Sequence, residues 1–194
     1  MIKQCVFVAG LLAATPLLAD IEDPCSDLWF SRNAMLDNAG YCFATPLGKA
    51  IFDNSDCTTK EPVLSRAIKT QIAGIIKLEQ GDAGGFYDAC NIDTSKRKLD
   101  LDAIPLRKQL DFQPATDGGT GICFGYLGTG IPLYSAPWKG ARQVGVIRAG
   151  DNMTFSHLDW KGWSFSLIGQ HADWSAVGWY RADLDENSCD TFAG

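Results

Sequence analysis

The two histidines, His157 and His171, are where chemistry would be expected first in this chain of 194 residues. A Ser-His-Asp or Cys-His site needs one of these imidazoles beside an activated nucleophile. The motifs that bring such groups together, among them G-x-S-x-G, H-E-x-x-H and the phosphate-binding P-loop, do not occur in the sequence. His171 falls in QHADW, a predicted loop, where we expect a solvated side chain and weigh a ligand contact as the alternative.

A glycosidase-like pair of carboxylates is the next possibility, since the chain carries 23 acidic residues. Such a pair needs a defined separation and one raised pKa. No spacing selects two members of the candidate set, which is Asp23, Asp27, Asp37, Glu79, Asp82 and Asp88. The sequence therefore predicts a binding protein that is not an enzyme and has no cofactor.

Aromatic side chains in the second half of the chain offer a binding chemistry. Alternation along a strand places Trp163, Phe165 and Leu167 on one face, and Val177 with Trp179 on one face, which we assign to the interior of a β domain. Five further aromatic residues are the predicted ligand-binding set: Tyr134, Trp138, Trp160, Trp174 and Tyr180. Flat apolar rings with polar tips suit extended peptides or sugar rings. In the alternative interpretation, these loops fold back over the core and seal a small domain.

The first nineteen residues, MIKQCVFVAGLLAATPLLA, have the layout of a secretory signal peptide: a lysine, an apolar run and a small residue at the end. We therefore exclude 1–19 from the fold and expect a periplasmic or secreted protein. The apolar run is too short to span a bilayer, and nothing downstream resembles a transmembrane helix.

The six cysteines beyond residue 19 are an even number in a chain bound for an oxidising compartment, which indicates disulfides. Six cysteines allow fifteen pairings. A zinc site would need paired spacings such as C-x-x-C, and these are absent, so we expect no metal. The spacing favours Cys25–Cys90, Cys42–Cys57 and Cys123–Cys189.

The net charge is acidic. Removing 1–19 takes away one of the 17 basic residues and none of the 23 acidic ones, so the charge changes from −6 to −7. Binding to nucleic acid or to an anionic membrane surface needs a basic stripe that the sequence lacks. The single basic run, 96–98, is flanked by aspartates and is interpreted as a solvated patch.

Hydrophobic periodicity divides the remaining chain into three parts. Residues 20–90 have helical spacing, with Ser26 as the expected cap of the first helix, a short helix or turn at 45–52, and Gly81 as the expected end of a helix over 63–80. Antiparallel packing of the two longer helices is our reason for pairing Cys25 with Cys90. Residues 91–121 form a predicted connector that ends in a glycine-rich hinge.

From residue 122 to 194 the pattern changes to short strands, namely ICFGYL, IPLYS, QVGVI, MTFS, WSFSLI and VGWY, separated by turn residues. This spacing predicts a small β-barrel or sandwich. The segment 99–112 keeps enough leucine and isoleucine that we expect it to pack on a neighbouring part of the fold.

The stretch LWFSRNAMLDNAGYCF, residues 28–43, mixes an apolar helical stripe with polar residues. Arg32 offers a planar fork for an anionic ligand, but a structural role is favoured, with Arg32 paired to an acid and Asn33 bound to backbone groups of the loop after Gly40. Gly40 suits a left-handed turn at the end of the helix, with Tyr41 contacting Met35 or Leu36.

Two resemblances follow from these residues. The order IPLYSAPWKGARQVGVIRAGDNMTF, WSFSLI, VGWYRADL resembles bacterial SH3 domains over 122–184, with an expanded tryptophan-rich middle. Arg32-Asn33-Ala34-Met35, then Gly40 and Tyr41-Cys42-Phe43, are similar to the YARHG family of exported bacterial domains. The cysteines resemble those of a relative found in exported alphaproteobacterial proteins.

These resemblances imply an α+β protein of the cell envelope, with a small disulfide-stapled helical domain followed by an SH3-like β-barrel. Neither family provides a catalytic residue to carry over. The implied function is recognition of peptidoglycan or a peptide through the aromatic face. The alternative is a protein-interaction module, such as an inhibitor or immunity protein of an exported enzyme, which the acidic charge suits.

Overall fold

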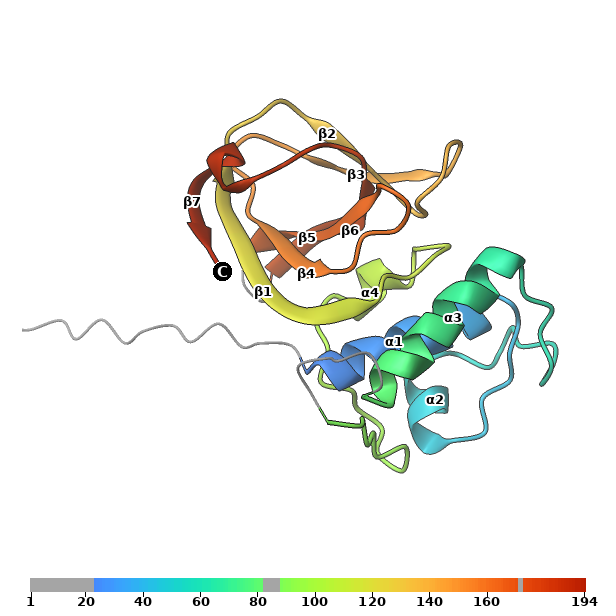
Figure 1. Cartoon of the computed structure of the whole chain (residues 1–194). Helices are drawn as coiled ribbons and strands as arrows, with labels where there is room; N and C mark the ends of the chain where they lie inside the picture. The colour runs from blue at the N-terminus through green and yellow to red at the C-terminus, as the bar shows by residue number, and fades with distance from the viewer. Residues whose placement is uncertain (1–22, 82–87, 171–172) are drawn as a thin grey trace, which may run out of the picture.

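The computed structural model describes residues 23–81, 88–170 and 173–194 (Figure 1). The predicted signal peptide and His171 lie outside these residues. In the described part, four helices are followed by a seven-stranded sheet, so the predicted α+β class is confirmed.

The helices are α1 (Pro24–Asp37), α2 (Pro46–Ile51), α3 (Arg66–Glu79) and α4 (Ile104–Arg107). The predicted cap of the first helix is wrong by three residues. Asp23 caps α1, and its carboxylate accepts hydrogen bonds from the backbone N–H groups of Cys25 and Ser26. Pro24 needs no such partner, which makes it a favourable first residue. At the other long helix, Gly81 follows the last turn of α3 with φ of +75°, as predicted.

Helices α1 and α3 lie side by side and antiparallel on one side of the sheet (Figure 1). Three disulfides fix the chain, Cys25–Cys90, Cys42–Cys57 and Cys123–Cys189, and they are the three pairings expected from the spacing. The first ties the start of α1 to the segment beyond α3, and the third ties two strands together.

The strands are β1 (Thr116–Tyr126), β2 (Ile131–Tyr134), β3 (Gln143–Ile147), β4 (Met153–His157), β5 (Ser164–Gln170), β6 (Asp173–Tyr180) and β7 (Cys189–Ala193). They form one antiparallel sheet in the order β3-β2-β6-β5-β4-β1-β7, with a short 3-10 helix, Glu186–Ser188, before β7. The sheet curls strongly (Figure 1), yet β3 and β7 remain as edge strands. The SH3-like barrel therefore stays a prediction. The strand β7 was not predicted.

Both faces of the curled sheet are buried. On the concave face, Leu133, Ile168 and Tyr180 pack in a cluster closed by the Cys123–Cys189 disulfide. On the convex face, a second cluster joins sheet residues to residues of α1 and α3, and its sheet members include Phe165, Leu167, Val177 and Trp179. These four residues are buried as predicted, but they face the helices and not the interior of the curled sheet. Trp163 is only half-buried.

The predicted connector belongs to this shared core. Leu110, Phe112 and Ala115 are buried in the cluster that also contains Leu28 of α1 and Ile75 of α3. The expectation that 99–112 packs on a neighbour is confirmed. The glycine-rich hinge is wrong, because 118, 119 and 121 lie within β1, which starts six residues before the predicted boundary at 122.

Candidate functional site

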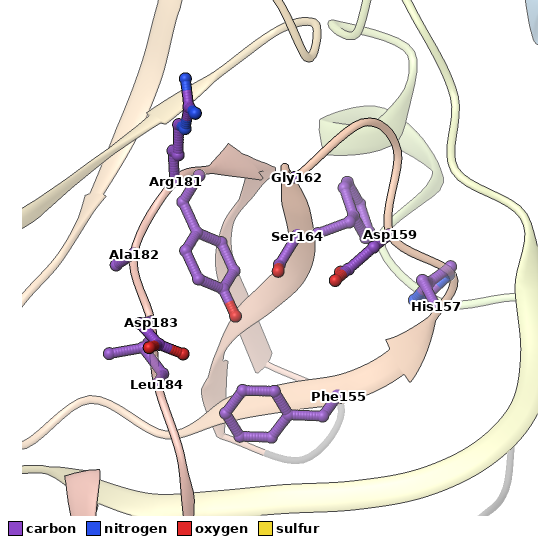
Figure 2. A pocket seen from close by; sticks show the side chains of 11 residues that line it. Phe155, His157, Asp159, Gly162, Ser164, Arg181, Ala182, Asp183 and Leu184 are labelled. Carbon is purple, nitrogen blue, oxygen red and sulfur yellow. The ribbon is translucent and has the colours of Figure 1, made fainter.

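A cavity of about 680 Å³ opens between the β4–β5 hairpin and the segment 181–184. Six of its lining residues carry the argument: Phe155, His157, Asp159, Ser164, Tyr180 and Asp183. Figure 2 shows Asp159 and Asp183 on opposite sides of the cavity with the Phe155 ring below them, whereas the guanidinium of Arg181 points away. The cavity is a binding-site candidate because polar groups converge in it on an aromatic floor.

The hydroxyl groups of Tyr180 and Ser164 both belong to the lining of this cavity. Burial raises the pKa of the Tyr180 phenol; the Ser164 hydroxyl opposes this effect, and the Asp159 carboxylate adds to it. Tyr180 therefore stays neutral in ordinary solution. The convergent groups are two neutral hydroxyls and two carboxylates.

A chain of aromatic contacts includes Trp160 and Trp163, which lie in the turn of the same hairpin. The Phe112 ring contacts Trp138 edge-on at 5.5 Å between ring centroids and Trp160 at 4.9 Å. Trp160 and Trp163 exchange two backbone hydrogen bonds, of 2.8 and 3.0 Å, across a tight turn. Trp163 in turn meets Tyr134 edge-on at 5.7 Å. We call Tyr134, Trp138, Trp160 and Trp163 the aromatic cluster.

The five predicted ligand-binding residues do not share one open face. Trp138 is 40% exposed, and Tyr134 and Trp160 are half-buried in the aromatic cluster. Trp174 packs against the shared core and donates its indole N–H to Asp102 at 3.3 Å, so it seals the fold as in the alternative interpretation. Tyr180 was predicted to point outward and is only 1% exposed, because the concave face of β6 is covered as well.

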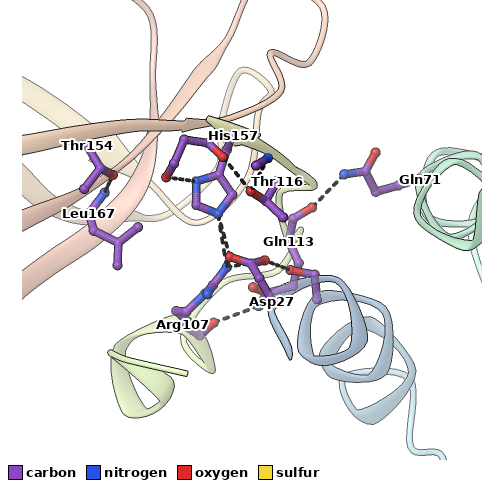
Figure 3. A network of polar contacts seen from close by, with 11 residues as sticks. Asp27, Gln71, Arg107, Gln113, Thr116, Thr154, His157 and Leu167 are labelled. Atoms are coloured by element: carbon purple, nitrogen blue, oxygen red, sulfur yellow. Dashed lines mark hydrogen bonds and ion pairs between the residues drawn. The ribbon is translucent and has the colours of Figure 1, made fainter. Parts of the chain in front are cut away.

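A buried polar network joins the helices to the sheet (Figure 3). The carboxylate of Asp27 in α1 accepts hydrogen bonds from Nη2 of Arg107 at 2.9 and 2.8 Å, and one of its oxygens lies 2.9 Å from Nε2 of His157 in β4. The hydroxyl of Ser31 donates to the same carboxylate at 3.2 Å. Although burial alone would raise the pKa of Asp27, the Arg107 guanidinium and the His157 ring hold it well below its usual range.

The network includes the residue types of a catalytic triad, since the Ser156 hydroxyl lies 3.1 Å from Nδ1 of His157. The arrangement suits a structural junction better. Both ring nitrogens of His157 are occupied, and Asp27 is neutralised by Arg107, whose side chain is fully buried. A hydrolase triad needs its base to be free to take a proton from the nucleophile beside an accessible substrate.

The corner after α1 is largely the structural clasp that the sequence predicts. Arg32 pairs with Glu79 of α3, with Nε at 3.0 Å from a carboxylate oxygen. Asn33 differs from its prediction, because its amide donates to the backbone carbonyl of Trp29 within α1, at 2.7 Å. The loop after Gly40 is held instead by Asn54, whose side chain exchanges two hydrogen bonds with the backbone of Phe43.

The cavity residues Asp159, Ser164 and Asp183 were not among the predicted site residues. The candidate carboxylates all lie in the helical half, and DWKGW was predicted to contribute only Trp160. The pentapeptide DWKGW contained a sequence signal for these residues. It forms a tight turn, in which Lys161 and Gly162 have positive φ, and this turn places Asp159 and Ser164 on its two sides, at the cavity.

Metal ligation receives no support from the residues that the structure describes. Among them, no three histidine, cysteine, aspartate or glutamate side chains are grouped to hold a metal ion. In the same part of the chain, no helix has both the length and the apolar character needed to cross a membrane.

Fold and site together define a disulfide-linked α+β protein whose helices and sheet share one core beside a polar cavity. Residues 89–194 match the family described as Domain of unknown function (DUF4453), and the chain belongs to this family. Residues 6–80 match the YARHG domain, which confirms that resemblance. The disulfides and the YARHG match fit a periplasmic or extracellular protein. No curated protein and no solved structure matches the chain.

Proposed function

We propose that this protein is exported to the cell envelope and binds peptidoglycan through the aromatic cluster of its sheet domain, without catalysing a reaction. The YARHG match and the three disulfides support the location. The Asp27 carboxylate and both ring nitrogens of His157 already have hydrogen-bond partners, which supports binding over catalysis.

One observation carries the proposal: the indole of Trp138 is 40% exposed although its ring is held edge-on against the buried Phe112. A ring fixed in this way loses little conformational entropy when a ligand stacks on it. Tyr134 and Trp160 are half-buried members of the same aromatic cluster, and rings of this kind suit sugar rings or an extended peptide.

The test is retention of the purified protein on insoluble peptidoglycan, compared with a known wall-binding protein. Trp138→Ala is expected to weaken binding by about tenfold, because a central aromatic anchor contributes about 1 kcal/mol or more. Phe124→Ala is the matched control, since Phe124 is 41% exposed but lies on β1, which β6, β5 and β4 separate from β2 in the sheet order. Its binding is expected to equal that of the wild type.

Two results would contradict the proposal. One is that the wild-type protein is not retained when the known binder is. The other is that both alanine variants bind as the wild type does. A stoichiometric protein partner recovered from the periplasm, together with no wall binding, would support the role of inhibitor or immunity protein instead.

A further inference from the structure

The cavity between the β4–β5 hairpin and the segment 181–184 is separate from the aromatic cluster and calls for a ligand of a different chemistry. Its volume of about 680 Å³ lies within the range of small-molecule sites, so it admits a sugar unit or one amino-acid residue and its neighbour. The question is which functional group its walls are built to recognise.

The charge of the walls is negative. Asp159 and Asp183 face each other across the cavity (Figure 2), and neither takes part in an ion pair with another residue that the structure describes. Arg181 contributes backbone to the rim, but its guanidinium is directed outward in Figure 2. His157 presents a ring whose two nitrogens already have partners on Asp27 and Ser156. The two carboxylates are therefore the charged groups available to a ligand.

The remaining wall residues suit an organic cation. The Phe155 ring forms the floor, and an aromatic face attracts an ammonium group or packs on its methylene carbons. The hydroxyls of Ser164 and Tyr180 line the same cavity and offer lone pairs to a donor. A metal ion would require a third carboxylate or a free imidazole, which the cavity does not provide.

We infer that this cavity binds a primary ammonium group, held between the carboxylates of Asp159 and Asp183 over the Phe155 ring. The inference deepens the proposed function, because peptidoglycan carries such groups in two places. One is the free amine of a diamino acid in a stem peptide, and the other is the amine of a de-acetylated sugar.

The probes are small amines and not cell wall. The amine test can therefore fail while wall binding is observed, and wall binding can fail while an amine binds. Nα-acetyl-lysine methylamide is titrated against its Nε-acetylated form, and glucosamine against N-acetylglucosamine. Binding is followed by the indole N–H signals in nitrogen–proton correlation spectra, since Trp160 and Trp163 belong to the hairpin that carries Asp159. We expect saturable shifts with one of the two amines and about tenfold weaker binding of its acetylated partner.

The double variant Asp159→Asn/Asp183→Asn removes both charges without changing side-chain volume. Both residues are exposed, so the fold is expected to survive, and thermal unfolding checks this. Binding of the preferred amine should weaken about tenfold, whereas Asp190→Asn, an exposed aspartate on β7, should bind as the wild type does.

Three results would overturn the inference: equal binding of the amine and its acetylated form, unchanged binding by the double variant, or no saturable shift with either amine. Calcium chloride is the last arm of the test. If calcium displaces the amine at a concentration below that of the amine, the cavity is assigned to a metal ion. Preference for lysine over glucosamine identifies the stem peptide as the source, and the reverse preference identifies the sugar.

Discussion

Nε2 of His157 lies 2.9 Å from Oδ2 of Asp27, although the two residues are 130 positions apart in the chain. The same carboxylate binds Arg107 of α4 through both oxygens. One buried carboxylate thus connects the first helix, the last helix and the middle of the sheet. The network makes the relative position of helices and sheet depend on a few ionisable side chains.

The first prediction concerns acid stability. The pKa of Asp27 is lower in the folded protein than in the unfolded chain, so ionised Asp27 stabilises the fold above the unfolded value. This contribution is lost as the pH falls through the unfolded pKa toward the folded one. The melting temperature is therefore expected to fall steeply between about pH 5 and about pH 2, and calorimetry checks it.

The control for acid stability is Asp27→Asn. This variant should melt at a lower temperature than the wild type at neutral pH, because Arg107 loses its counter-charge. It should also lose less further stability on acidification, since the group that titrates is absent. A variant whose melting temperature falls as steeply as that of the wild type would show that other carboxylates cause the acid sensitivity.

The second prediction compares two ion pairs that differ in burial. Arg107→Met leaves Asp27 charged and buried without its main partner, and it is expected to lower the free energy of unfolding by about 3–5 kcal/mol. Arg32→Met breaks the pair with Glu79, whose side chains are 25% and 15% exposed, and should cost about 1 kcal/mol or less. Urea unfolding measures both. Equal losses would mean that burial does not set the strength of these pairs.

Local patterns in the sequence were sufficient to predict most of the elements. Period-two alternation located six strands, and the apolar spacing of 63–80 located α3, because each pattern reflects one covered side of one element. The strand β7 was missed because its side chains from Asp190 to Ala193 are exposed and show no alternation. The Cys25–Cys90 pairing followed from placing the two longer helices antiparallel, and the other two pairings followed from the spacing of the cysteines.

Contacts between elements were harder to predict from the sequence. Alternation correctly separated Trp179 from Tyr180, but it could not reveal that helices cover one face of the sheet while the sheet's own curl covers the other. For that reason Tyr180 was wrongly assigned to an exposed face. The Asp27–His157 contact has no local signature at all, because nothing near either residue specifies a partner 130 positions away.

The third prediction concerns the disulfides. Loop-closure entropy predicts that removing Cys42–Cys57, which spans 15 residues, costs about 3 kcal/mol. Removing Cys123–Cys189, which spans 66 residues, should cost about 4 kcal/mol. Paired Cys→Ala variants compared in urea unfolding give these losses. A larger loss for the short loop than for the long one would show that packing at the bridge outweighs loop length.

The fourth prediction concerns the shared core. Phe112 is fully buried and contacts the rings of Trp138, Trp160 and Trp179, so Phe112→Ala should cost about 3–5 kcal/mol. Because helices and sheet pack on the same cluster, helical and aromatic circular dichroism should change in one transition. Phe124→Ala, at a residue that is 41% exposed, should change stability by less than about 0.5 kcal/mol. Two separate transitions in the wild type would contradict the shared core.

The fifth prediction compares alanine substitutions at two glycines. Gly40 has φ of +80°, and a Cβ atom there would collide with the Thr58 side chain, which packs against the turn after α1. Gly74 lies inside α3, and a Cβ atom there would meet no other atom within 4 Å. Gly40→Ala is therefore expected to destabilise the fold by more than about 1 kcal/mol, through backbone strain and the collision.

Gly74→Ala is expected to raise stability by about 0.5–1 kcal/mol, because alanine restricts the unfolded chain and favours the helix. Thermal unfolding of both variants measures the difference in sign. If both substitutions destabilise, α3 is not a regular helix at Gly74 in solution. If neither does, the turn at Gly40 is able to take a right-handed conformation, and the clasp between α1 and the Cys42–Cys57 loop depends on the disulfide and on Asn54 alone.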